Sequence, residues 1–114
     1  MKSDERSMQA LSENAVIVHF KLSDDDFGSG YERDEVRALG RKIENALRAA
    51  GIGELDGDEF GGGEAALFLY GPDANALYES ISTLLRNNTI RPDYVILRYG
   101  EADDPVAKER RIYL

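Results

Sequence analysis

The sequence predicts an α+β fold in which two helices cover one face of an antiparallel β-sheet. Two segments, residues 31–50 and 73–86, carry apolar residues at the spacing of an amphipathic helix. Short apolar or alternating segments, which are typical of strands, precede, separate and follow these helices. The resulting order is strand, helix, strand, strand, helix, strand. Because each helix has a single apolar stripe, we expect both helices to pack on the same face of the sheet.

The first strand is expected at residues 15–22, where two sets of side chains alternate. His19 belongs to the set that faces away from the core, on a central strand. A lone histidine needs a partner group to act as a catalytic base, so a half-buried sheet residue is the simpler interpretation. The core-facing set is predicted to be Val16, Val18, Phe20 and Leu22.

The loop after this strand, SDDDFGSG at residues 23–30, leads into the first helix. A Gly-Ser-Gly sequence ahead of a helix can present backbone amides to a phosphate. Three aspartates precede it here, and it lacks both the lysine of a P-loop and the spacing of a dinucleotide-binding motif. We therefore interpret the segment as a turn.

The first helix is expected at residues 31–50, with Gly51 in the left-handed conformation that commonly closes a helix. Its predicted buried stripe is Val36, Leu39, Ile43, Ala46, Leu47 and Ala50. A row of arginines on one flank has two interpretations: a surface for an acidic partner, or a solvated face with ion pairs four residues apart. The second is the more general one. The row is Arg33, Arg37, Arg41 and Arg48, with Glu44 among them.

Residues 51–70 are predicted to form the hairpin around which the rest of the chain is organised. Three successive glycines, 61–63, permit the positive φ that a tight reversal needs. The arm before them is rich in charge and is expected to be a frayed edge strand, where charge opposes edge-to-edge association. The apolar arm at residues 65–70 is expected to be a central strand.

The carboxylates of this hairpin raise the question of a metal site. An EF-hand loop needs glycine at its sixth position and glutamate at its twelfth, and no loop starting at Glu54 or Asp24 meets both requirements. Alternate residues of a strand also point to opposite faces, so these carboxylates do not all converge. We therefore predict no metal site, and nothing in the sequence indicates a cofactor. The carboxylates are Glu54, Asp56, Asp58, Glu59 and Glu64.

The second helix is expected to start from an Asp73 N-cap and to end near Arg86. A strand is expected next at residues 94–99, with Val95, Leu97 and Tyr99 on one face, and a fifth strand at residues 110–114. The predicted buried stripe of the helix is Ala74, Leu77, Ile81, Leu84 and Leu85.

This order of elements predicts a ferredoxin-like βαββαβ two-layer sandwich with strand order 4-1-3-2 and a possible extra C-terminal strand. With DGDEFGGGE at residues 56–64 and YGPDA at residues 70–74, the chain resembles small bacterial proteins of this pattern whose activity is uncharacterised. The resemblance implies the fold and no activity, because this fold hosts many functions.

Composition narrows the classes of function. The chain has 114 residues, which we divide into a flexible tail at residues 1–13 and one α+β domain at residues 14–114. A net charge of −8 opposes binding to nucleic acid and to anionic membranes. The chain has no cysteine and one histidine, which excludes a thiolate nucleophile and a multi-histidine metal site within one chain. The N-terminal segment lacks the apolar core of a signal peptide, and we expect a cytoplasmic protein.

One face of the predicted sheet stays uncovered by helices and is the candidate binding surface. RNA-binding domains of this topology stack bases there, but Glu64 and Ala65 replace the basic and aromatic residues of their motif. The candidates for this face are His19, Tyr94, Ile96 and Arg98, together with either Phe68 and Tyr70 or Leu67 and Leu69.

The function expected from the sequence is a non-catalytic protein-interaction or regulatory module that binds a protein partner, or itself, through this face. One alternative is an immunity or inhibitor protein that neutralises a basic toxin or nuclease, because opposite charge speeds association. Another is a small dimeric enzyme or ligand-binding domain with a site around His19. That site would use His19 with Arg98 or a tyrosine of the sheet face. It would need a carboxylate close to His19 and a concave pocket, and the observation that decides is whether His19 and Arg98 line a closed cavity or a flat exposed surface.

Overall fold

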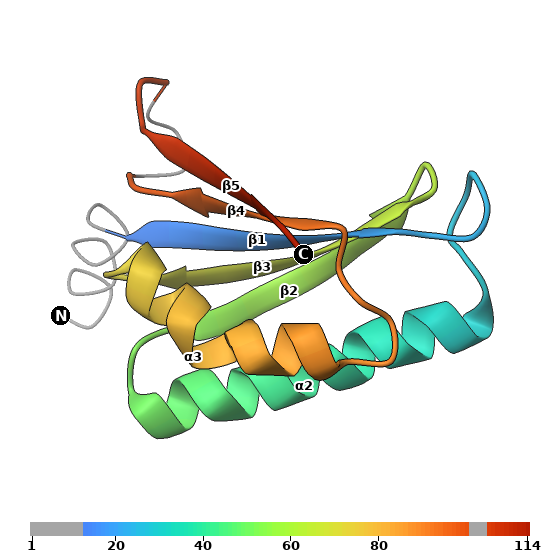
Figure 1. Cartoon of the computed structure of the whole chain (residues 1–114), viewed down its shortest axis with the longest axis horizontal. Helices are drawn as coiled ribbons and strands as arrows, with labels where there is room; N and C mark the ends of the chain where they lie inside the picture. The colour runs from blue at the N-terminus through green and yellow to red at the C-terminus, as the bar shows by residue number, and fades with distance from the viewer. Residues whose placement is uncertain (1–12, 101–104) are drawn as a thin grey trace, which may run out of the picture.

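The computed structural model describes residues 13–100 and 105–114. Five strands form one antiparallel sheet in the order β2-β3-β1-β4-β5, with both helices on the same side of it (Figure 1). This is the predicted ferredoxin-like α+β arrangement with an extra C-terminal strand. The elements are β1 (Asn14–Lys21), α2 (Gly30–Ala50), β2 (Glu54–Gly61), β3 (Glu64–Gly71), α3 (Ala74–Asn87), β4 (Tyr94–Arg98) and β5 (Glu109–Tyr113). Most of the predicted tail, residues 1–12, and the turn at residues 101–104 lie outside the described residues.

The core is built on the alternation of β1, the middle strand of the sheet. Val16 lies between Leu69 and Leu97, and the next core residue, Val18, lies between Leu67 and Val95 on the same two neighbouring strands. The side chains of this cluster are almost completely buried under the helices. The predicted core face of the first strand is therefore confirmed, including Phe20 and Leu22.

Helix α2 starts with a capping box. The Ser29 hydroxyl accepts a hydrogen bond from the Glu32 amide, and the Glu32 carboxylate accepts one from the Ser29 amide. Gly28 has φ +78° and Gly51 has φ +67°, which glycine adopts without strain. The Gly-Ser-Gly segment is thus a turn, as predicted, and its Gly28 and Ser29 amides donate hydrogen bonds to the Asp24 and Glu32 carboxylates of the protein itself.

The buried stripe of α2 differs from the prediction at its margin. Gly40 is buried between Val36 and Ile43, in line with Leu39 and Leu47, whereas Ala46 is half-buried and Ala50 is exposed. The stripe advances by four, three and four residues through Val36, Gly40, Ile43 and Leu47. This spacing leaves Ala46 at its edge, and Ala50 lies in the solvent-exposed last turn.

Helix α3 begins at the predicted N-cap, where the Asp73 carboxylate accepts a hydrogen bond from the Ala76 amide at 3.1 Å. The Asn14 side chain, from the start of β1, accepts a second one from the Ala74 amide at 3.1 Å. Leu84, which was expected in the buried stripe, lies half-buried at its margin. Within the described ranges, no helix has the length and apolarity needed to cross a membrane.

Strands β2 and β5 form the two edges of the sheet. β2 was expected to fray, but it pairs with β3 over its whole length, apart from a bulge between Leu55 and Gly57 that accommodates Asp56. β2 does not fray because two of its side chains, Leu55 and Phe60, pack against the core. β5 pairs with β4 along the edge of β4 that faces away from β1.

The turn between β2 and β3 is fastened to the acidic loop after β1. The Gly63 amide donates a hydrogen bond to the Asp26 carbonyl, and the Leu22 amide donates one to the Gly63 carbonyl, both at 2.8 Å. Gly62 and Gly63 have φ of +60° and +81°. A Cβ on Gly63 would lie 2.8 Å from the Asp24 carbonyl oxygen, whereas a Cβ on Gly62 would meet nothing within 4 Å.

These two glycines give a matched pair of substitutions. Gly62→Ala should lower the free energy of unfolding by about 1 kcal/mol, the cost of a left-handed conformation for alanine. Gly63→Ala should cost roughly 1–3 kcal/mol more, because the added methyl also overpacks the contact with the loop. Urea unfolding of the two variants measures the difference. Equal losses would show that the loop does not pack on the turn.

Candidate functional site: the open sheet face

The face of the sheet opposite the helices, called the open sheet face below, carries four rows of side chains that run across the strands. The row at the end of β1 is the shortest: Lys21 lies opposite Glu64, which pairs with Gly61. The middle row is mainly apolar. Ile17 on β1 lies between Phe68 on β3 and Ile96 on β4, and the row ends at Gly57 on β2 and Arg111 on β5. The three apolar side chains are only half-buried. They form an apolar strip that no described helix covers.

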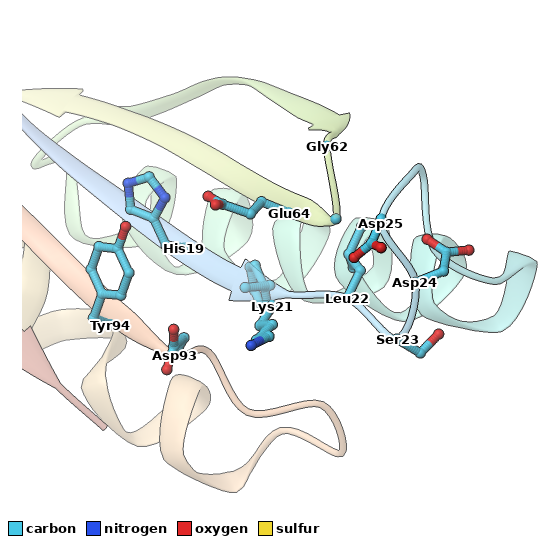
Figure 2. A pocket seen from close by; sticks show the side chains of 12 residues that line it. His19, Lys21, Leu22, Ser23, Asp24, Asp25, Gly62, Glu64, Asp93 and Tyr94 are labelled. Atoms are coloured by element: carbon cyan, nitrogen blue, oxygen red, sulfur yellow. The ribbon is translucent and has the colours of Figure 1, made fainter.

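The second row contains His19 and two tyrosines. His19 lies between Ala66 and Tyr94, and the row ends at Glu59 and Tyr113. The His19 ring stacks on the Tyr94 ring with 4.5 Å between centroids and 18° between planes (Figure 2). Tyr113 is 70% exposed, but its ring lies 5.8 Å from the Tyr94 ring, and its hydroxyl accepts a hydrogen bond from the Arg111 guanidinium at 3.5 Å.

The third row carries an ion pair. The Arg98 guanidinium and the Glu109 carboxylate lie 2.7 Å apart across β4 and β5. Ala15 occupies the centre of the row, with Tyr70 and Glu54 on its other side. Burial raises the pKa of the Tyr70 phenol, with smaller contributions from the Asp56 and Glu13 carboxylates, so this phenol stays protonated at neutral pH.

The predicted site residues all lie on this face. The sequence left open which pair of residues β3 contributes, and the structure places Phe68 and Tyr70 here because Leu67 and Leu69 are completely buried in the core. His19 and Arg98 share the face but belong to its second and third rows, with the middle row between them.

Two shallow depressions flank His19. One, of about 360 Å³, lies between the end of β1, the acidic loop and Asp93, and Glu64 and Tyr94 also line it (Figure 2). The other, of about 300 Å³, lies over Ala66, with Glu59, Glu64 and Phe68 around it. Arg98 lines neither of them. Neither of these two depressions therefore brings His19 and Arg98 together.

The environment of His19 does not activate the imidazole. Burial lowers its pKa below the ordinary value of 6.5; the Glu64 carboxylate opposes this shift, Arg111 adds to it, and Asp93 opposes it. Within the described part of the chain, no side chain hydrogen-bonds to the ring, as a general base requires. Among the same residues, no group of His, Asp and Glu side chains has the arrangement to hold a metal ion.

Charge divides the open sheet face into two halves. The β2–β3 half carries four carboxylates and no basic residue: Glu54, Asp56, Glu59 and Glu64. The β4–β5 half carries two arginines and one carboxylate: Arg98, Arg111 and Glu109. Sequence reasoning did not assign Arg111 and Tyr113 to this face. Arg111 and Tyr113 are two residues apart and so share one face of the terminal strand. Only the pairing of β5 with β4 shows that this face is the open one.

The arginine row of α2 is largely paired within the protein. Arg48 forms an ion pair with Glu44 at 2.8 Å, and Arg37 lies 3.8 Å from the Asp58 carboxylate and over the Phe60 ring. The Arg33 guanidinium donates hydrogen bonds to backbone carbonyls of the acidic loop. Three of its four arginines thus have intramolecular partners, which fits the interpretation as a solvated helix face.

Comparison of the chain with protein-family models, curated proteins and solved structures finds no match. Any inference about function therefore rests on the geometry and charge of the open sheet face.

The lowered pKa of His19 predicts a pH dependence of stability. The unfolded chain, with a histidine pKa near 6.5, binds a proton at higher pH than the folded chain does. The free energy of unfolding should therefore fall as the pH drops from about 7 through 6.5 toward the folded-state pKa, because protonation favours the unfolded chain.

His19→Gln should remove this part of the pH dependence, as measured by urea unfolding between about pH 7 and pH 5. Hydrogen bonds from backbone amides lower the pKa values of the Asp24 and Glu32 carboxylates. Their contribution to stability is therefore lost at lower pH than that of His19. An unchanged slope in the variant would contradict the assignment to His19.

Proposed function

We propose that this protein is a non-catalytic protein-interaction module that binds its partner through the open sheet face. The observation that supports the proposal most directly is the uncovered apolar strip of Ile17, Phe68 and Ile96 at the centre of the face. A contiguous apolar surface rimmed by charged residues is typical of a site that binds another molecule. His19 and Arg98 line neither described depression together, which favours a macromolecular partner over a small molecule. We place this module in the cytoplasm, in keeping with a sequence that has no cysteine.

A more specific form of the proposal is an immunity or inhibitor protein for a basic toxin or nuclease. The observation that favours it is the group of four carboxylates on the β2–β3 half of the face. Such a surface attracts a basic protein and speeds its association. The alternative of a small enzyme with a site around His19 has less support, because the imidazole has no hydrogen-bonded partner within the described residues.

The test compares two variants that add the same charge on opposite sides of the molecule. Ile96→Asp places a carboxylate in the apolar strip, and Thr83→Asp places one at an exposed position on α3. Each variant and the wild type are immobilised and exposed to lysate of the source organism at low and moderate salt. We expect a retained protein that Ile96→Asp loses and Thr83→Asp keeps.

Circular dichroism and a thermal melt confirm that both variants are folded. Retention of a basic protein whose binding weakens with salt would favour the inhibitor form of the proposal. The proposal is wrong if Ile96→Asp retains the same proteins as the wild type, or if the wild type retains none and does not self-associate either.

A further inference from the structure

The open sheet face has an acidic half and a basic half, so a matching partner would present a basic half to the first and an acidic half to the second. The acidic half lies on β2 and β3, and the basic half lies on β4 and β5, on either side of the middle strand β1. Arg111 forms no ion pair with another described residue: its guanidinium lies 4.4 Å from the centre of the Tyr94 ring. A basic side chain and a set of carboxylates therefore stand exposed on opposite halves of one apolar strip.

Side-chain size follows the same division. The acidic half has two small residues, Gly57 and Ala66, and the second lies at the bottom of the depression of about 300 Å³. The basic half has large side chains at the corresponding positions: Arg111 ends the row that begins at Gly57, and Tyr94 shares the row of Ala66. The acidic half is thus hollowed over Ala66, while the basic half has larger side chains at the matching positions.

We propose that the partner is a second copy of this chain, bound face to face about a two-fold axis parallel to the strands. The inference rests on the proposed function, since it assigns an occupant to the same open sheet face. Rotation about such an axis places β1 over its own copy, β4 over β3 and β5 over β2. The basic half of each copy then covers the acidic half of the other, in a self-complementary interface.

The middle row and the row of His19 match under this rotation. Ile17 meets Ile17 of the second copy, and Phe68 meets Ile96, so the apolar strips cover each other. Tyr94 lies over Ala66, and Arg111 lies over Gly57 with Glu59 next to it. The stacked Tyr94–Arg111 pair of one copy thus enters the depression of the other, at the usual separation of about 10 Å between packed sheets.

The alternative two-fold axis in the plane of the interface runs across the strands. It would place β2 over β2 and β5 over β5, so the carboxylates of the acidic half would face their own copies. Like charges in direct opposition are unfavourable across an interface. On the axis parallel to the strands, Arg111 lies next to Glu59. Glu54 then lies over Glu109, which is already paired with Arg98, and Lys21 lies over its own copy beside Glu64. The balance of charges therefore favours this axis.

The experiment uses the purified full chain in sedimentation equilibrium at neutral pH and low salt. The chain mass is 12.7 kDa, and we expect twice this value for the wild type. Glu59→Lys and Arg111→Glu should each raise the dissociation constant of the dimer at least about tenfold, because each opposes like charges. The double variant, which exchanges the two charges, should return it to within about threefold of the wild type.

A matched control exchanges two charges on the helical side. Glu79→Lys combined with Arg41→Glu makes the same change of charge at exposed positions of α3 and α2, and should leave the dissociation constant unchanged. Circular dichroism checks that every variant is folded. If Arg111→Glu does not fold, Arg111→Gln with its smaller expected weakening replaces it.

The outcomes separate this inference from the proposed function. A monomeric wild type overturns the dimer, while the lysate experiment with Ile96→Asp still decides whether the face binds another protein. A dimer that Ile96→Asp leaves intact uses another surface and overturns the inference. A double variant weaker than both single variants overturns the axis, whereas rescue supports it.

Discussion

The register of β1 with its two neighbours is the constraint on which the rest of the structure depends. β1 pairs antiparallel with β3 on one side and β4 on the other, and its alternation separates a buried face from an open one. A slip of one residue would exchange the two faces and move Val16 and Val18 out of the core. The same register that buries these valines presents Ile17 and His19 on the opposite face. Core and candidate binding surface are therefore two results of one pairing.

The helices and loops hold this register in place. The Asn14 side chain ties the start of β1 to the first turn of α3, and the Leu22 amide ties its end to the turn between β2 and β3. Between these points the Asp93 amide donates a hydrogen bond to the His19 carbonyl at 2.7 Å, at the beginning of β4. Each end of the middle strand is thus fixed by a contact with a distant part of the chain.

Much of this fold could be predicted from the sequence, because the apolar residues of β1, α2, α3 and β4 repeat at the periods of their elements. The buried face of β3 could not, since Leu67, Phe68 and Leu69 are all apolar and only pairing with β1 decides which of them is buried. The contribution of β5 was also hidden. Arg111 and Tyr113 alternate in a short polar segment whose partner strand cannot be read from its own composition.

The carboxylates of the hairpin show the same division between what the sequence determines and what pairing determines. Strand alternation predicted that they would not converge, and the structure separates Asp58, beside Arg37 of α2, from Glu59 on the open sheet face. The bulge at Asp56 has no counterpart in the prediction. It inserts one residue into β2 and allows both Leu55 and Phe60 to reach the core.

The pairing of β1 with β4 has a consequence for how the protein is made. β1 acquires its second neighbour only after both helices and the hairpin have been synthesised. Val16 and Val18 therefore remain without half of their cross-strand contacts until β4 has emerged. Long-range pairing of this kind is slow, because the chain must close large loops before the contacts form. Pairing of β1 with β4 thus follows the synthesis of the whole intervening segment, and a chain interrupted before Tyr94 leaves one side of β1 unpaired.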